Sequence, residues 1–268
     1  MIDIGINFTN KSFRNQVGQA IHHANEAGVS HMIVTGTDVE CSQAALALCK
    51  QHPETLFCTA GVHPHDSSQW NASVCNTIKN LLDNPEVVAV GETGLDFNRD
   101  FSPRDAQENA FREQLELAVA TGKPLFLHER DAFNLQYAIL QEYRDHISGG
   151  VQHCFTGTRE ALNAYLDLGL YIGITGWICD ERRGQALQEL VAYIPDDRLL
   201  IETDGPYLLP RDLKPKPKSR RNEPKYLPHI AQRIADLRKQ PLEVLISHTV
   251  ANSIRCFQLP LTHKPGKN

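Results

Sequence analysis

The sequence predicts an α/β protein of the (β/α)₈ barrel class, and two observations support this prediction. Eight short runs of apolar, mostly β-branched residues recur along the chain, separated by turn residues and by segments with helical periodicity. Strands that alternate with helices form parallel sheets, and eight uninterrupted repeats fit a closed barrel better than an open sheet. The open doubly wound sheet is the alternative, but no glycine-rich phosphate loop follows the first run.

The apolar runs give the bounds of the predicted strands: residues 2–7, 31–37, 56–62, 86–92, 123–129, 150–155, 170–175 and 198–203. Helical periodicity is clearest in NQVGQAIHHANEAG, DAQENAFREQLELAVATG and TREALNAYLDLG, each of which closes with a glycine. No linker-like segment interrupts the series of strands. We therefore expect a single barrel domain over residues 1–268.

Composition excludes several classes of protein. Apolar residues make up 41% and charged residues 22%, which is typical of a globular chain and not of a disordered or fibrous one. No apolar stretch approaches the roughly 18 residues of a membrane span, and no secretory leader precedes the first strand, so a cytoplasmic location is predicted. The seven cysteines contain no C-x-x-C pair, which predicts reduced thiols and no disulfide framework.

The charge of the chain is unevenly distributed. The net charge is −5, but the segment from Arg211 to Lys225 contains seven basic and two acidic residues, a local net charge of +5. It is rich in proline and follows the eighth predicted strand, where barrel enzymes place functional loops. A nucleic-acid backbone is the partner that such a loop favours, and the expected contacts are Arg211, Lys216, Lys218, Arg220 and Arg221.

Residues that can bind a metal or a phosphate occur near the carboxyl ends of several different predicted strands. In a closed barrel these ends surround one mouth, and barrel enzymes build their active sites there. Taken alone, each residue could equally be a hydrogen-bonded structural histidine or a helix cap. Their shared position favours one site, formed by His63 and His65 after the third strand, Glu92, His128, His153 and Asp204.

Two imidazoles and two carboxylates form a mixed nitrogen and oxygen ligand set. Glu92, His128, His153 and Asp204 are therefore the predicted ligands of a divalent metal such as Mg²⁺, Mn²⁺ or Zn²⁺. Such a metal activates water for hydrolysis and stabilises the negative charge that develops on a phosphoryl or carbonyl oxygen. No serine-nucleophile motif of the G-x-S-x-G type competes with this interpretation.

Long segments of the chain resemble a known family. They are DIGINFT, GVHPHDSSQW, GETGLDFNR, HCFTGTRE, YIGITGWICDERRG, IETDGPYLLPRDLKPKP and RRNEP, which together extend over essentially the whole sequence. By these segments the chain resembles the TatD family of metal-dependent deoxyribonucleases, which are amidohydrolase-like barrels. The resemblance implies a 3′-to-5′ exonuclease that prefers single-stranded DNA and a role in DNA repair. RNA stays open as a further substrate, and no obligate protein partner is expected.

The resemblance also implies roles for individual residues. The metal ligands of the family map onto Glu92, His128, His153 and Asp204, and its phosphate-contacting histidine maps onto His63, with His65 as a second candidate. Glu92 and Asp204 are the implied catalytic residues, with Asp204 as the acceptor of a proton from the nucleophilic water. The basic segment after the eighth strand would line the path of the DNA.

One departure from the family pattern concerns the first strand. The family usually carries an Asp-x-His-x-His motif there, whereas this chain has Asp3, Gly5 and Asn7 at the corresponding positions. Without these imidazoles, a second metal position depends on carboxylate and water oxygens, which favours loosely held Mg²⁺, or Mn²⁺, over Zn²⁺. Two other functions stay open: hydrolysis of an amide or lactone, and a non-catalytic accessory role in protein export.

Overall fold

The computed structural model describes residues 1–261, and in them eight strands form one sheet in the order β1 to β8. The sheet closes on itself, because the Asn7 amide donates to Gly205 O at 2.8 Å and the Asp204 amide donates to Gly5 O at 2.8 Å. The fold is thus the predicted (β/α)₈ barrel. Its strands are β1 (Ile2–Ile6), β2 (His31–Val34), β3 (Leu56–Ala60), β4 (Val87–Asp96), β5 (Leu125–Arg130), β6 (Gly150–Gln152), β7 (Tyr171–Ile174) and β8 (Leu199–Ile201).

Helices alternate with the strands along the chain. They are α1 (Val17–Glu26), α2 (Val39–Gln51), α3 (Ala72–Leu82), α4 (Arg104–Thr121), α5 (Phe133–Glu142), α6 (Arg159–Asp167), α7 (Gln185–Leu190), α8 (Leu227–Arg238) and α9 (Leu242–Phe257). The chain also forms short 3₁₀ helices: η1 (Lys11–Phe13), η2 (Pro64–Gln69), η3 (Gly176–Cys179), η4 (Val191–Tyr193) and η5 (Pro224–Tyr226). Among residues 1–261, no helix combines the length and hydropathy needed to cross a membrane. All seven cysteines are free thiols, as predicted.

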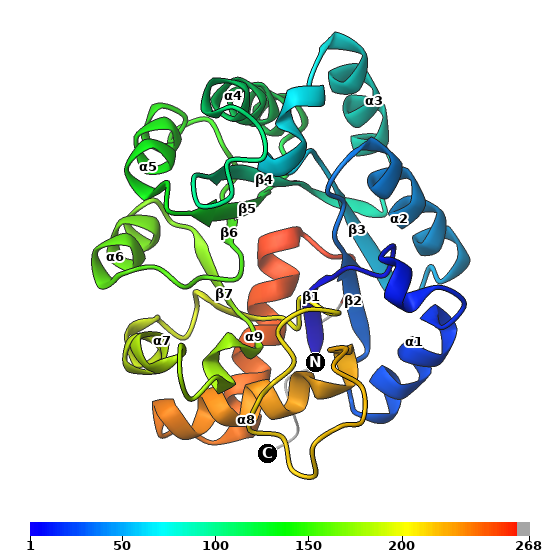
Figure 1. The fold of residues 1–268 in the computed structure, drawn as a ribbon, viewed down its shortest axis with the longest axis vertical. Helices are drawn as coiled ribbons and strands as arrows, with labels where there is room; N and C mark the ends of the chain where they lie inside the picture. The colour runs from blue at the N-terminus through cyan, green and yellow to red at the C-terminus, as the bar shows by residue number, and fades with distance from the viewer. Residues whose placement is uncertain (262–268) are drawn as a thin grey trace. The chain divides into compact units, whose positions relative to one another are not determined.

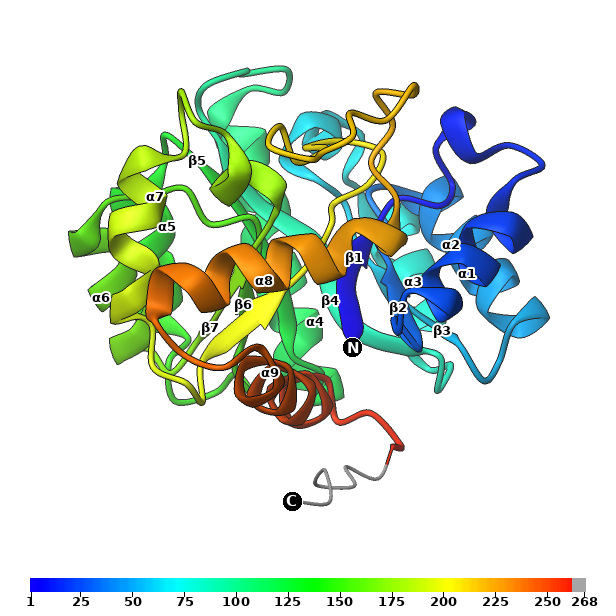
Figure 2. The same ribbon diagram turned by 90° about the horizontal axis from the view of Figure 1, so that it is seen from below.

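The contacts divide the chain into two compact units. The first unit comprises residues 1–33, 154–162 and the chain from 172 onward, and the second comprises residues 34–153 and 163–171. In the second unit, β3, β4 and β5 lie side by side with α2 to α5 on their outer side (Figure 1). In the first unit, α8 and α9 pack against each other and against β8 (Figure 2). The single domain expected over residues 1–268 stays a prediction, and its last seven residues lie outside the described chain.

Local sequence signals account for the ends of several helices. The three glycines predicted to close helices, Gly28, Gly122 and Gly169, have φ angles of 83°, 66° and 79°, the left-handed conformation that glycine adopts without steric cost. At the other ends, the Asp38 carboxylate accepts from the Cys41 amide at 2.7 Å, and Asn71 caps α3 through the Ser73 amide at 2.9 Å. These caps satisfy amides that the helices leave unpaired.

The structure corrects the position of three site residues relative to their strands. β4 is longer than predicted, so Glu92 lies inside the strand and not at its end. The extension arises because β4 shifts register after Gly91 and then pairs with β5 as far as Asp96 and Arg130. His153 follows β6, where we expected it within the strand, and Asp204 lies three residues beyond the end of β8.

A buried carboxyl group joins β1 to the segment after β8. Asp3 is fully buried, and its oxygens accept from the Thr203 amide at 2.9 Å and the Thr203 hydroxyl at 2.5 Å. The Gly5 amide also donates to it at 3.3 Å. Burial outweighs these bonds and raises the pKa of Asp3 from 3.8 to about 7.

We predict that Asp3 makes the stability of the barrel depend on pH. Because its pKa is higher in the folded state than in the unfolded chain, its stabilising contribution is complete below about pH 4 and is lost as the pH rises through about 7. The pKa of Asp3 differs by about three between the folded and unfolded states, which corresponds to a change of at most about 4 kcal/mol in the free energy of unfolding. Asp3→Asn should therefore flatten the fall in the urea unfolding midpoint between pH 5 and pH 8. The exposed substitution Asp145→Asn is the control, and an equally steep fall in Asp3→Asn and the wild type would contradict the prediction.

Candidate metal centre

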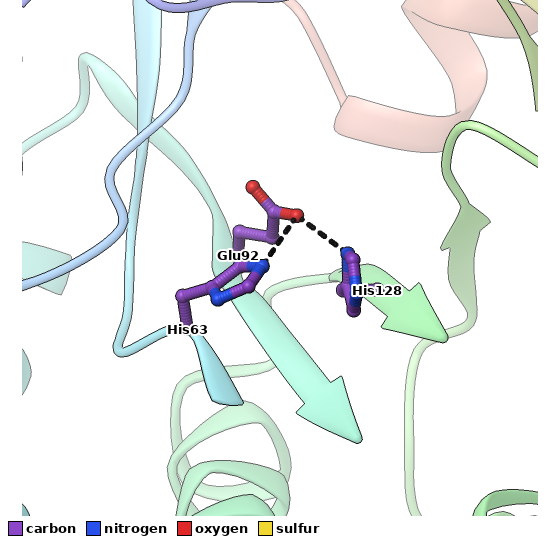
Figure 3. A group of neighbouring side chains, drawn as sticks. All are labelled: His63, Glu92 and His128. Carbon is purple, nitrogen blue, oxygen red and sulfur yellow. Dashed lines mark hydrogen bonds and ion pairs between the residues drawn. The ribbon is translucent and has the colours of Figure 1, made fainter. Parts of the chain in front are cut away.

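Three imidazoles of the second unit converge on one carboxylate oxygen. Oε1 of Glu92 lies 2.8 Å from His153 Nε2, 3.0 Å from His128 Nδ1 and 3.4 Å from His63 Nε2. Figure 3 shows the rings of His63 and His128 directed at this oxygen. Glu92 and His153 are 6% and 5% exposed, so the group is buried and not at a solvent-facing rim. The structure therefore brings together five of the six predicted site residues: His63, Glu92, His128 and His153 around one oxygen, and His65 beside them, with its ring centroid 4.2 Å from that of His63.

The charge on Glu92 is maintained by its neighbours. Burial alone would raise the pKa of this carboxyl, but the surrounding imidazoles of His153, His63 and His128 outweigh it and lower the pKa well below its ordinary value. For His63 the balance is the opposite, since burial lowers its pKa to about 4 despite the attraction of Glu92. At neutral pH the centre thus contains an ionised carboxylate beside a neutral His63.

A second buried carboxylate, Asp96, belongs to the same cluster and was missed by the sequence analysis. Its Oδ2 lies 2.7 Å from His65 Nε2 and 3.4 Å from His128 Nε2, so His128 stands between Glu92 and Asp96. Burial opposes its ionisation, but the two imidazoles and the Arg99 amide hold the pKa of Asp96 below its ordinary value. The predicted fourth strand ended at Glu92, and the register shift that extends β4 to Asp96 has no local sequence signal.

Buried glutamines from the outer helices fix the backbone that carries the cluster. Gln114 of α4 bonds both the amide and the carbonyl of Val62, immediately before His63, at 2.8 and 3.0 Å. Gln107 of α4 accepts from the Asp96 amide at 2.8 Å, and Gln136 of α5 accepts from the Leu95 amide at 2.9 Å. These bonds satisfy backbone groups that would otherwise be unpaired in the core and so restrict the strand ends.

The donor atoms of the centre fit a divalent cation. His128 Nε2 is shielded from solvent and has no hydrogen-bond partner, although it lies near Asp96. A buried nitrogen that has only this long contact can still take a ligand. His63, Glu92 and His128 also offer atoms within 4.8 Å of one another, the spacing of a candidate metal group. Imidazole and carboxylate ligands suit Mg²⁺, Mn²⁺ and Zn²⁺.

The tautomer of His63 follows from its contact with the backbone of His65. Its Nδ1 accepts a hydrogen bond from the His65 amide at 3.1 Å, so in the neutral ring the proton is on Nε2. Metal-binding histidines instead donate their second ring nitrogen to a neighbour. The geometry therefore makes His63 a hydrogen-bond donor that faces the centre, which suits contact with a phosphate oxygen better than coordination.

Asp204 is described within the first unit. It follows β8 with a φ of 54°, and Asn7 Nδ2 donates to its Oδ1 at 2.9 Å. Asn7 also donates to Gly205 O at 3.1 Å. Asn7 thus uses its amide nitrogen to orient the Asp204 carboxylate.

The basic residues of the loop after β8 fall into two groups. Arg211 pairs with Glu181 at 3.1 Å, and Arg221 pairs with Glu223 at 3.0 Å and donates to Ser12 O at 2.6 Å. These two arginines anchor the loop within the first unit. Lys214, Lys216, Lys218 and Arg220 are exposed and form no ion pair within the described residues, so they can contact a ligand.

Another group with metal-ligand spacing occurs in the first unit. Cys179, Asp212 and His229 offer atoms within 4.8 Å of one another. Asp212 Oδ1 and His229 Nε2 are only 2.6 Å apart and satisfy each other as a hydrogen bond. This pair ties the loop after β8 to α8 without a metal.

Comparison with known proteins agrees with this geometry. Residues 2–258 match the family model described as TatD related DNase. The chain is 52% identical over 259 residues to a protein of Edwardsiella piscicida named 3′-5′ ssDNA/RNA exonuclease TatD, with 97% of this chain and 100% of the relative covered. A protein of the same name from Citrobacter rodentium is 52% identical over 261 residues, with 97% and 99% covered.

Solved structures give the same result. A TatD homologue from Escherichia coli K12 superposes with a TM-score of 0.88 at 27% identity, covering 97% of this chain and 98% of the other. A TatD family hydrolase from Entamoeba histolytica gives 0.87 at 27% identity, covering 96% and 97%. An organophosphorus hydrolase from Deinococcus radiodurans, 11% identical with a TM-score of 0.64, shares the fold. The full-length match, the barrel and the buried cluster lead to one conclusion: the chain belongs to the TatD family of deoxyribonucleases.

Proposed function

We propose that this chain is a divalent-metal-dependent 3′-to-5′ exonuclease that hydrolyses phosphodiester bonds of single-stranded DNA, and of RNA as a second substrate. The observation that carries the proposal is the convergence of His63, His128 and His153 on one oxygen of the buried, ionised Glu92. The names of the two relatives support the substrate class. A role in DNA repair and a cytoplasmic location stay predictions.

Each residue of the centre has a distinct proposed task. Glu92, His128 and His153 would hold the cation, which supplies an activated water and neutralises charge on the phosphate. His63 would donate its Nε2 proton to a phosphate oxygen, because its Nδ1 is already an acceptor. His65 is hydrogen-bonded to Asp96, so it would help to position the substrate beside His63 and would take no part in the reaction itself.

Asp204 is the proposed acceptor of the proton released by the attacking water, and a proposed ligand of a second, looser cation. Its position after a barrel strand is typical of catalytic residues in this fold. The hydrogen bond from Asn7 orients the Asp204 carboxylate, and a general base needs a defined orientation. Lys216, Lys218 and Arg220 would neutralise phosphates along the strand.

The deciding experiment is digestion of end-labelled single strands of DNA and RNA by the purified protein with added Mg²⁺. A 3′-to-5′ exonuclease releases mononucleotides progressively from a 5′-labelled strand and leaves a shortening labelled ladder. Internal cleavage, or the absence of cleavage with every divalent metal, would contradict the proposal. Assays with amide and lactone substrates test the alternative hydrolase directly.

We predict that Glu92→Gln lowers kcat/KM by more than about 100-fold while the barrel stays folded. The amide keeps the shape of the side chain but loses the charge that three imidazoles and the cation require. Circular dichroism verifies the fold, and the exposed change Glu40→Gln on α2 is a matched control. Near wild-type cleavage by Glu92→Gln would contradict the proposal that Glu92 holds the cation.

We predict that the second cation, near Asp204, is held loosely because the first strand lacks the two family histidines. Dialysis against a chelator should abolish activity, and Mg²⁺ or Mn²⁺ at roughly millimolar concentration should restore it. Elemental analysis of the protein before dialysis measures the metal that stays bound. Two equivalents of firmly bound zinc per chain would contradict this prediction.

We predict that the exposed basic residues of the loop bind the DNA backbone. Changing Lys216, Lys218 and Arg220 together to alanine should weaken binding and reduce the slope of log Kd against log salt concentration by about 2, from roughly 0.7 per lost phosphate contact. The double variant Lys79→Ala, Arg144→Ala removes exposed charge elsewhere and is the control. An unchanged slope in the triple variant would show that these residues do not contact DNA phosphates and that the loop is only a solvated surface.

A further inference from the structure

An exposed aromatic ring lies beside the metal centre. Phe101 is 65% exposed, more than the other large apolar residues reported as exposed in the described chain, Tyr193, Tyr207 and Val244. Its ring centroid is 4.7 Å from that of His65, and the His65 centroid is 4.2 Å from that of His63. One imidazole therefore separates Phe101 from the proposed phosphate contact.

The short segment that carries Phe101 is fixed at both ends. At its start, Asp96 Oδ1 accepts from the amides of Asn98 and Arg99 at 3.0 and 2.9 Å. At its end, the buried Ser102 hydroxyl donates to His65 O at 2.8 Å, and Gln107 donates to Ser102 O at 2.9 Å. The exposure of Phe101 is therefore imposed by an anchored backbone and is not the result of a loose loop.

A positive charge accompanies the ring. The Arg99 guanidinium carbon lies 5.9 Å from the Phe101 centroid, close enough for a cation–π contact. Aromatic rings flanked by cations are the usual device for binding single-stranded nucleic acid, because bases stack on the ring while phosphates meet the cation. Apolar ligands without charge would not require Arg99 at this place.

We propose that Phe101 is the stacking platform for a nucleobase close to the scissile phosphodiester and that Arg99 contacts a neighbouring phosphate. This inference rests on the proposed nuclease function and deepens it. A base in a duplex is stacked between its neighbours and must leave them to reach the ring, whereas an unpaired base can turn onto it. Phe101 thus gives the enzyme a physical reason to prefer single strands.

The test compares two single strands that differ only in whether their last two 3′ nucleotides carry bases or are abasic. Wild-type enzyme should cleave the normal strand with a kcat/KM about tenfold or more above that of the abasic strand. Phe101→Ala should lose most of this preference by slowing only the normal strand, and Phe101→Trp should retain it. Arg99→Ala should slow both strands by the same factor, because both keep their phosphates.

The outcomes separate the inference from the function on which it rests. Tyr193→Ala, which removes another exposed ring, should behave as wild type, and circular dichroism reports the fold of each variant. If the wild type cleaves both strands equally, or if Phe101→Ala slows both equally, the stacking platform is refuted while the nuclease function stands. If the wild type cleaves neither strand under any metal, the proposed function itself fails.

Discussion

The centre depends on a single buried negative charge, that of Glu92. Removing a carboxylate from water is expensive, and it stays ionised only where compensating groups surround it. Here three imidazoles point at one of its oxygens, and the backbone at the nearby strand ends is restricted by glutamines from α4 and α5. A divalent cation is the natural companion of such a group, because burial keeps His63 neutral near pH 7 and so leaves it no full positive charge to offset the carboxylate.

Much of the fold could be predicted from the sequence because its signals are local. Apolar runs correctly predicted all eight strands. Gly28, Gly122 and Gly169 correctly predicted three helix ends, since each adopts the left-handed conformation for which glycine is suited. The length of β4 could not be predicted in the same way. It depends on pairing with β5 across a register shift, where a side chain at Gly94 would collide with the carbonyl of His128.

The site was predicted in its histidines and Glu92 but not in Asp96. Histidine near a strand end is conspicuous, whereas an aspartate followed by Asn98 and Arg99 resembles an ordinary turn. Asp96 is a turn residue and also a member of the site. Its Oδ1 accepts from the Asn98 amide in the turn, and its Oδ2 contacts His65. In the basic loop, the sequence alone does not distinguish Arg211 and Arg221 from Lys216. The structure shows that both arginines pair with acidic partners within their own unit, and their contact with a substrate stays a prediction.

The two oxygens of Asp96 also connect substrate binding to the metal centre. Oδ2 faces His65 and His128, while Oδ1 fixes the amides from which the segment with Phe101 begins. A displacement of this carboxylate would therefore move an imidazole of the centre and the exposed ring together. Ser102 reinforces the connection, because its hydroxyl bonds the backbone of His65 from the other end of the segment. Stacking of a base on Phe101 and alignment of its phosphate with His63 are for this reason parts of one rigid arrangement, which is the property that a site needs to place a phosphodiester for attack.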